Sequence, residues 1–243
     1  MDSLIKNEWN LINIEEYYML LESLKIPEKV VWTRNIVNTK KECLAIPSKT
    51  LKEISKAIFR GNYISFLDIM PNKNHESLII DAYVISKIKD FKAQTKYILK
   101  LAKYIDNWSV VDTLKFNIKN HEDDYFSFAR KMASYKLPFY RRIGVRVIFS
   151  LIGCDNLLED VFKYIDAFVL EEDYYVNMAL SWLLCELFIK RRKETIDYLS
   201  SAHLNNFVLS KFISKCHDSY RVSPSDKLML SSYKTNYHCY NGG

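Results

Sequence analysis

Glycine and proline are scarce in this sequence, which contains only five of each in 243 residues. A fold rich in β-sheet needs many turns, and these two residues are the strongest markers of turns. Their scarcity argues against such a fold and favours long helices joined by short connections. The sequence also lacks an apolar run of membrane-spanning length, because the best one, residues 179–189, is interrupted by Glu186. We therefore expect no membrane partner.

The motifs of the common enzyme classes are missing as well. The cysteines and histidines form no CxxC pair, no HExxH helix and no mixed ligand cluster, and there is no GxSxG elbow or glycine-rich phosphate loop. These residues are Cys43, Cys154, Cys185, Cys216 and Cys239, and His75, His121, His203, His217 and His238. Their pattern predicts reduced thiols and no metal or cofactor. Because the N-terminus also lacks the apolar core of a signal peptide, we expect a cytoplasmic protein.

Apolar residues, which make up 49% of the chain, recur at steps of three and four residues along most of its length. This period predicts helices over residues 14–24, 27–36, 48–60, 63–69, 77–88, 93–105, 125–134, 139–152, 156–168, 174–189, 193–199, 204–215 and 226–233. Ser48 is expected to cap the third of them. No segment has the strict two-residue alternation of a half-buried strand.

Helices of this length in pairs, at intervals of roughly forty residues, are typical of an α-solenoid of HEAT type. We therefore expect an all-α fold of HEAT-like helical repeats in one domain over residues 1–243, curved around a concave basic cleft, with a flexible tail at the last few residues. The net charge of +6 has the sign that suits a polyanion. A compact helical bundle is the competing architecture.

Residues 106–112 combine a helix start with an aromatic ring and a carboxylate. Asp106 and Asn107 resemble a cap, and Trp108 and Asp112 follow at a spacing of four residues, so their side chains share one helical face. A cationic ligand would meet both a π face and a negative charge there. The alternative is a core tryptophan above an aspartate that pairs with a nearby lysine.

Arginines open the otherwise apolar helix predicted over residues 139–152. Arg141 and Arg142 lie in its first turns, where a positive charge opposes the helix dipole, and Arg146 follows. Phosphate is a natural partner, because an arginine holds it with two donors and the helix start adds backbone amides. An ordinary ion pair with a neighbouring acid is the alternative.

Two further stretches combine aromatic, basic and capping residues. Trp182 lies in the apolar helix over residues 174–189, where core packing is the default, and a basic cluster ends that helix. The cluster consists of Lys190, Arg191, Arg192 and Lys193. Near the C-terminus, Ser223 or Ser225 suits the cap of the last helix, and Arg221 is placed to contact a phosphate.

With these residues the chain resembles the AlkD-type DNA alkylation repair family of HEAT-like repeat DNA glycosylases, over most of its length. The landmarks are Ala-Ile-Pro at 45–47, Asn-Trp-Ser-Val-Val-Asp-Thr at 107–113, Arg-Arg-Ile-Gly-Val at 141–145, the segment 174–182, and the stretch from Glu-Thr at 194–195 to Ser-Tyr-Arg-Val at 219–222. Their order and spacing together carry the resemblance. The N-terminal helix from residue 27 is present but divergent.

The resemblance implies a role for each landmark residue. Trp108, Asp112, Arg142 and Trp182 would line a cleft that faces the lesion, with Arg141, Arg146, Lys190, Arg191, Arg192 and Arg221 as further DNA contacts. It implies a monomeric enzyme that hydrolyses the N-glycosidic bond of cationic alkylated purines, such as 3-methyladenine and 7-methylguanine, in double-stranded DNA without base flipping. Some branches of this fold lack glycosylase activity, so a DNA-binding or protein-interaction scaffold is the alternative.

Overall fold

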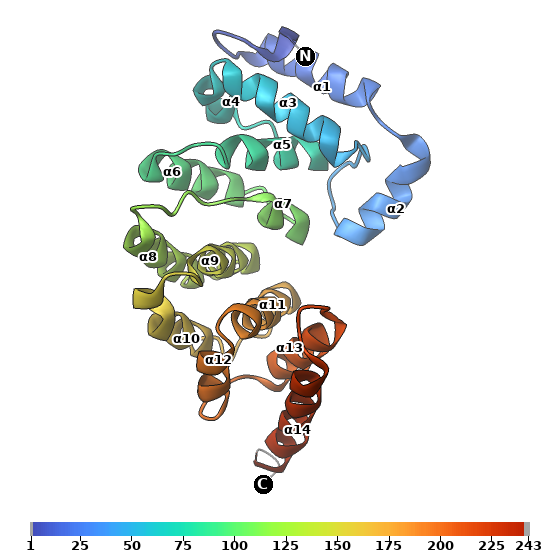
Figure 1. Cartoon of the computed structure of the whole chain (residues 1–243). Helices are drawn as coiled ribbons and strands as arrows, with labels where there is room; N and C mark the ends of the chain where they lie inside the picture. The colour runs from blue at the N-terminus through green and yellow to red at the C-terminus, as the bar shows by residue number, and fades with distance from the viewer. Residues whose placement is uncertain (1, 241–243) are drawn as a thin grey trace. The chain divides into compact units, whose positions relative to one another are not determined.

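The computed structural model describes the backbone of residues 2–240 and the side chains of residues 2–233. Within these residues the chain forms fourteen α-helices and two short 3₁₀-helices and no β-strand, which confirms the all-α prediction (Figure 1). Cys239, His238 and the predicted tail lie outside the described side chains. The chain divides into two compact units, Met1–His121 and Glu122–Gly243, which we describe separately.

The first unit contains one 3₁₀-helix and seven α-helices. They are η1 (Asp2–Leu4), α1 (Leu11–Ser23), α2 (Pro27–Val37), α3 (Ser48–Arg60), α4 (Tyr63–Ile69), α5 (His75–Ile85), α6 (Phe91–Ala102) and α7 (Trp108–Thr113). All the helices expected in this half are confirmed. Ser48 is the first helical residue rather than the cap, because the cap position is taken by Pro47, which makes no side-chain bond.

The second unit contains one 3₁₀-helix and seven more α-helices. They are α8 (Glu122–Ala133), α9 (Pro138–Leu151), η2 (Asp155–Leu157), α10 (Leu158–Asp166), α11 (Tyr174–Lys190), α12 (Arg192–Leu199), α13 (Asn206–Asp218) and α14 (Pro224–Tyr240). The last helix begins with Pro224, and the Ser223 hydroxyl accepts a hydrogen bond from the Asp226 amide at 3.1 Å, as expected of its cap.

Helices α3, α5 and α7 pack side by side and run parallel in the first unit (Figure 1). Their N-termini lie together: the Glu76 carboxylate of α5 accepts the amides of Leu44 and Ala45, just before α3, at 2.9 and 2.7 Å. The Nδ1 atom of His75 in α5 lies 3.3 Å from the side-chain amide nitrogen of Asn107, the cap of α7. The central helix α5 is buried on nearly all sides, and most of its residues after Ser77 are apolar.

Helices α9, α11 and α13 form the corresponding parallel layer of the second unit. Arg142 near the start of α9 donates to the Tyr175 carbonyl near the start of α11, and Arg191 at the end of α11 donates to the Ile152 carbonyl at the end of α9. Helix α8 packs closely on α9 at Gly144, where a Cβ atom would lie 2.6 Å from the Tyr164 hydroxyl and 2.9 Å from the Ala129 carbonyl. The helical-repeat prediction is therefore confirmed within each unit.

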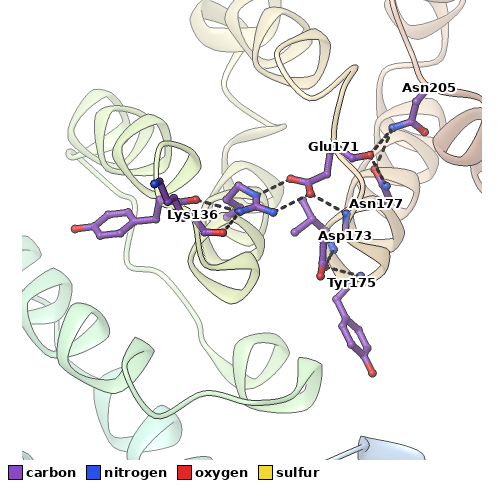
Figure 2. Close-up of polar contacts among 9 residues, drawn as sticks. Lys136, Glu171, Asp173, Tyr175, Asn177 and Asn205 are labelled. Carbon is purple, nitrogen blue, oxygen red and sulfur yellow. Dashed lines mark hydrogen bonds and ion pairs between the residues drawn. The ribbon is translucent and has the colours of Figure 1, made fainter.

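A buried carboxylate fixes the N-terminal edge of this layer, as Figure 2 shows for Glu171 and its neighbours. Glu171 accepts two hydrogen bonds from the Arg141 guanidinium, at 2.6 and 2.8 Å, and one from the Asp173 amide at 2.9 Å. Its backbone carbonyl accepts from Asn177 of α11 and from Asn205, the cap of α13. One loop residue thus ties the starts of α9, α11 and α13 together.

The interior of the first unit contains a carboxyl group without a hydrogen bond to any described residue. Asp81 of α5 is fully buried, and the hydroxyl of Tyr17, also fully buried, is unbonded as well. Burial raises the pKa of Asp81 well above its ordinary value of 3.8, although the positive charge of Lys100 opposes this. The carboxyl group is therefore protonated under conditions in which exposed aspartates are charged.

Replacing Asp81 with asparagine should stabilise the protein increasingly as the pH rises. The folded protein holds a proton that the unfolded chain has lost above pH 3.8, so the free energy of unfolding falls as the pH rises from this value to the raised pKa. We expect Asp81→Asn to raise the free energy of unfolding at pH 7 by on the order of 1 kcal/mol, and by less at pH 4. Denaturant unfolding at both pH values measures this change, and Asp2→Asn, at an exposed position, is the control. If Asp81→Asn changed the free energy of unfolding equally at pH 4 and pH 7, the raised pKa of Asp81 would be contradicted.

Glu171, Arg141 and Asp173, which we call the Glu171 cluster, should make the free energy of unfolding rise with pH rather than fall. Burial raises the pKa of Glu171, but the hydrogen bonds from Arg141 and from the Asp173 amide outweigh it, so the net pKa lies below the ordinary 4.5. The ion pair therefore stabilises the fold above pH 4.5, and this contribution is lost as the pH falls through the lowered pKa. Glu171→Gln should cost about 1–3 kcal/mol at pH 7 and much less at pH 3. Glu172→Gln, one residue further and exposed, is the control for the same unfolding measurement.

Candidate active site

Helix α7 has only six residues, too few to be stable alone, and a polar network fixes it in place. Asp106, just before it, accepts hydrogen bonds from the Thr39 hydroxyl at 2.9 Å and from the Lys40 amide at 2.7 Å, in the loop after α2. Asn107 caps the helix by accepting the Ser109 amide at 3.1 Å, as its sequence predicts. The start of α7 is therefore held by its own cap and by the loop after α2.

Trp108 and Asp112 lie one turn apart on this anchored helix. The Trp108 ring is half-buried, and its Nε1 donates to the carbonyl of Ile36, near the end of α2, at 3.3 Å. The Trp108 side chain is thus only partly buried, and the alternative of a core tryptophan above a paired aspartate stays open. This bond fixes the plane of the ring relative to α2.

Asp112 lines an open hollow of about 450 Å³, which we call the lysine hollow. The hollow lies between α3, the end of α5 and α7, and is lined by Lys52, Lys56, Tyr83, Ser86, Lys87, Asp112, Thr113 and Lys115. Four lysines thus surround the one carboxylate. The sequence analysis did not identify these lysines, since they come from three separate segments.

Arg141 and Arg142 are adjacent in the chain but play different structural roles. Arg141 is part of the Glu171 cluster, which is the ion pair expected as its alternative. Arg142 is buried, with 4% of its surface exposed, and donates to the Tyr175 carbonyl at 2.5 Å. Its side chain is therefore held rigidly against the start of α11.

Trp182 lies in a row of aromatic and cationic side chains that crosses α9, α11 and α13. The tryptophan is 42% exposed, so the expectation of core packing is wrong. Its ring meets the edge of Phe149 at 5.9 Å and lies 5.3 Å from the Lys215 ammonium, while the Arg146 guanidinium lies 4.6 Å from the Phe149 ring. Arg146 is thus laid along the surface, and its neighbours Phe149 and Lys215 were missed by the sequence analysis. A spacing of three residues between Arg146 and Phe149 was the available signal.

The remaining basic candidates mostly have acidic partners. Arg191 pairs with Asp155, Arg192 with Asp226 and Arg221 with Glu186. Arg221 is therefore paired, whereas the sequence analysis expected it to contact a phosphate. The basic cluster spans the junction of two helices rather than one helix end, because Arg191 follows α11 as its cap and Arg192 begins α12. Lys190, the last residue of α11, is exposed.

The four central candidates are divided between the two units. Trp108 and Asp112 belong to α7 of the first unit, and Arg142 and Trp182 lie on the adjacent helices α9 and α11 of the second. The Trp182 ring lies beside the Lys215 ammonium, and an aromatic face beside a charge suits a ligand with both π and ionic character. No helix among the described residues is long and apolar enough to span a membrane, and these residues contain no group of three potential metal ligands.

Comparison with known proteins agrees with these features. No curated protein matches the chain. The model of the family described as DNA alkylation repair enzyme matches residues 19–215, which include all the helices from α2 to α12 and the whole of the lysine hollow. The chain therefore belongs to the DNA alkylation repair enzyme family.

Proposed function

We propose that this protein is a DNA repair glycosylase that removes cationic alkylated purines, such as 3-methyladenine and 7-methylguanine, as the first step of base excision. The observation that carries the proposal is the anchored pair of Trp108 and Asp112, in a chain that belongs to a DNA alkylation repair family. A tryptophan and a carboxylate on a helix held at its N-terminal end are suited to a reaction whose substrate carries positive charge.

The chemistry of the substrate requires little from the protein. A purine alkylated at a ring nitrogen is cationic and therefore a good leaving group, and departure of the base leaves an oxocarbenium-like sugar. The Asp112 carboxylate stabilises this sugar cation and orients the attacking water, as carboxylates do in glycoside hydrolysis. No general acid is needed, because the departing base is already charged. Trp108 presents its ring to the cationic nucleoside.

The second unit provides further candidate DNA contacts. Trp182 offers a π face to double-stranded DNA, and the buried Arg142 contributes positive charge from beneath the surface. We propose that the protein acts as a cytoplasmic monomer and attacks the sugar while the base remains in the duplex, without the base flipping used by most glycosylases. The exposed ring of Trp182, flanked by Lys215 and Phe149, supports the assignment of a nucleic-acid surface.

A DNA-binding member of the family without glycosylase activity is the second candidate. The observation that favours it is the pairing of Arg141, Arg191, Arg192 and Arg221 with carboxylates, which leaves fewer cations for the DNA than the sequence suggests. Such a protein would retain duplex binding when Asp112 is neutralised, and it would release no base.

Asp112→Asn separates the two candidates. With duplex DNA that contains 7-methylguanine or 3-methyladenine, we expect wild type to release the free base and the variant to be slower by at least about a hundredfold, because the neutral amide no longer stabilises the sugar cation. Single-turnover base release, followed by chromatography, measures this. Asp2→Asn, which removes an exposed carboxylate outside the site, should match wild type. Wild type that releases neither base, nor a bulkier alkylated base, would rule out the enzymatic proposal.

A further inference from the structure

The exposed face of α3 carries a row of cations that leads into the lysine hollow. Lys52, Lys56 and Arg60 follow one another at steps of four residues, so their side chains leave the same face of the helix about 6 Å apart. A second hollow, of about 570 Å³, continues the first along α3 and is lined by Glu53, Lys56, Phe59, Arg60 and Lys87. Lys56 and Lys87 line both hollows, which makes the basic surface continuous.

The lysines of this surface repel one another. Burial lowers the pKa of Lys87 below its ordinary value of 10.5, and the charges of Lys56 and Lys115 lower it further. The carboxylates that line the two hollows are Asp112 and Glu53, against the five cations Lys52, Lys56, Arg60, Lys87 and Lys115. Among the described residues, the ammonium groups of Lys56, Lys87 and Lys115 form no ion pair or hydrogen bond. A bound anion would relieve this repulsion.

Stabilisation of helix ends does not account for the lysines. Lys87 and Lys115 follow the ends of α5 and α7, where positive charge is favourable. Elsewhere in this chain, cations in that role donate directly to terminal carbonyls: Lys100 bonds to the carbonyl of Leu67 in α4 at 3.1 Å, and Arg191 to that of Ile152 at 3.2 Å. In the lysine hollow, the ammonium groups of Lys87 and Lys115 donate to no described carbonyl, and the Lys52 ammonium lies 5.7 Å from the centre of the Tyr83 ring.

We propose that the lysine hollow holds a phosphodiester of a DNA strand beside Asp112, and that Lys52, Lys56 and Arg60 guide the same strand along α3. The inference rests on the proposed function for the identity of the ligand. A row of cations about 12 Å long matches a polymer of regularly spaced phosphates better than a single free phosphate. The lysines also offset the repulsion between the Asp112 carboxylate and the DNA backbone, so the sugar of the bound nucleotide can approach the carboxylate. They act as positioning residues.

The test removes three charges from the surface and compares salt dependence. The variant Lys52→Ala/Lys56→Ala/Lys87→Ala is matched by Lys92→Ala/Lys103→Ala/Lys119→Ala, which removes three exposed lysines elsewhere in the first unit. The probe is unmodified duplex DNA. Its Kd is measured by fluorescence anisotropy at salt concentrations between 50 and 200 mM. We expect the slope of log Kd against log salt to fall by about 2–3 in the first variant and by less than about 1 in the control.

Two results would overturn the inference. One is an unchanged slope in the first variant, and the other is an equal fall in both variants, which would reflect net charge alone. A third measurement identifies the source of the phosphate: the pKa of Lys87, followed by NMR, should rise on addition of duplex but not of inorganic phosphate at the same ionic strength. An equal rise with inorganic phosphate would contradict the assignment to a strand.

Base release in the same preparations separates this inference from the proposed function. If wild type excises 7-methylguanine but the triple lysine variant has the same slope of log Kd against log salt as wild type, the phosphate site is wrong and the enzymatic proposal stands. If the slope of log Kd against log salt falls in the variant while wild type excises no base, the phosphate site stands and the enzymatic proposal fails. Circular dichroism of both variants checks that the helices are intact; five of the six lysines are exposed and Lys87 is partly buried.

Discussion

Parallel stacking of helices is the constraint on which both units depend. Helices that run in the same direction bring their N-termini together, and each N-terminus has unpaired amides and a positive dipole end. Carboxylates hold these ends together: Asp173 caps α11 by accepting the Tyr175 amide, the buried Glu76 of α5 accepts two amides just before α3, and Glu171 joins α9 to the start of α11.

The candidate site is a consequence of this arrangement. Asn107 caps the start of α7 and Asp106 bonds to the loop after α2, and together they hold a helix of one and a half turns that would not form alone. The positions of Trp108 and Asp112 depend on these bonds. Lys87 and Lys115 follow the C-terminal ends of α5 and α7, and together with Lys52 and Lys56 of α3 they line the hollow that contains Asp112. The fold thus places a carboxylate inside a positive surface, which is an arrangement suited to a cationic lesion in a polyanionic polymer.

The sequence predicted the helices because their apolar period is local, and it predicted the cap at Asn107 for the same reason. It did not predict the lysine hollow, because α3, α5 and the chain after α7 contribute to it from positions more than fifty residues apart. It also assigned Arg191, Arg192 and Arg221 to DNA without their acidic partners, which only the packing of distant helices provides. Phe149 escaped notice because a phenylalanine in an apolar helix has the pattern of a core residue.

The central claim is that the protein recognises the positive charge of the lesion through Trp108 and Asp112. The most direct measurement compares single-turnover release of 7-methylguanine with that of 7-methyl-7-deazaguanine, which has nearly the same shape but no charge, from otherwise identical duplexes. The account predicts release of the cationic base alone. Release of both bases at similar rates, or of neither, would contradict it.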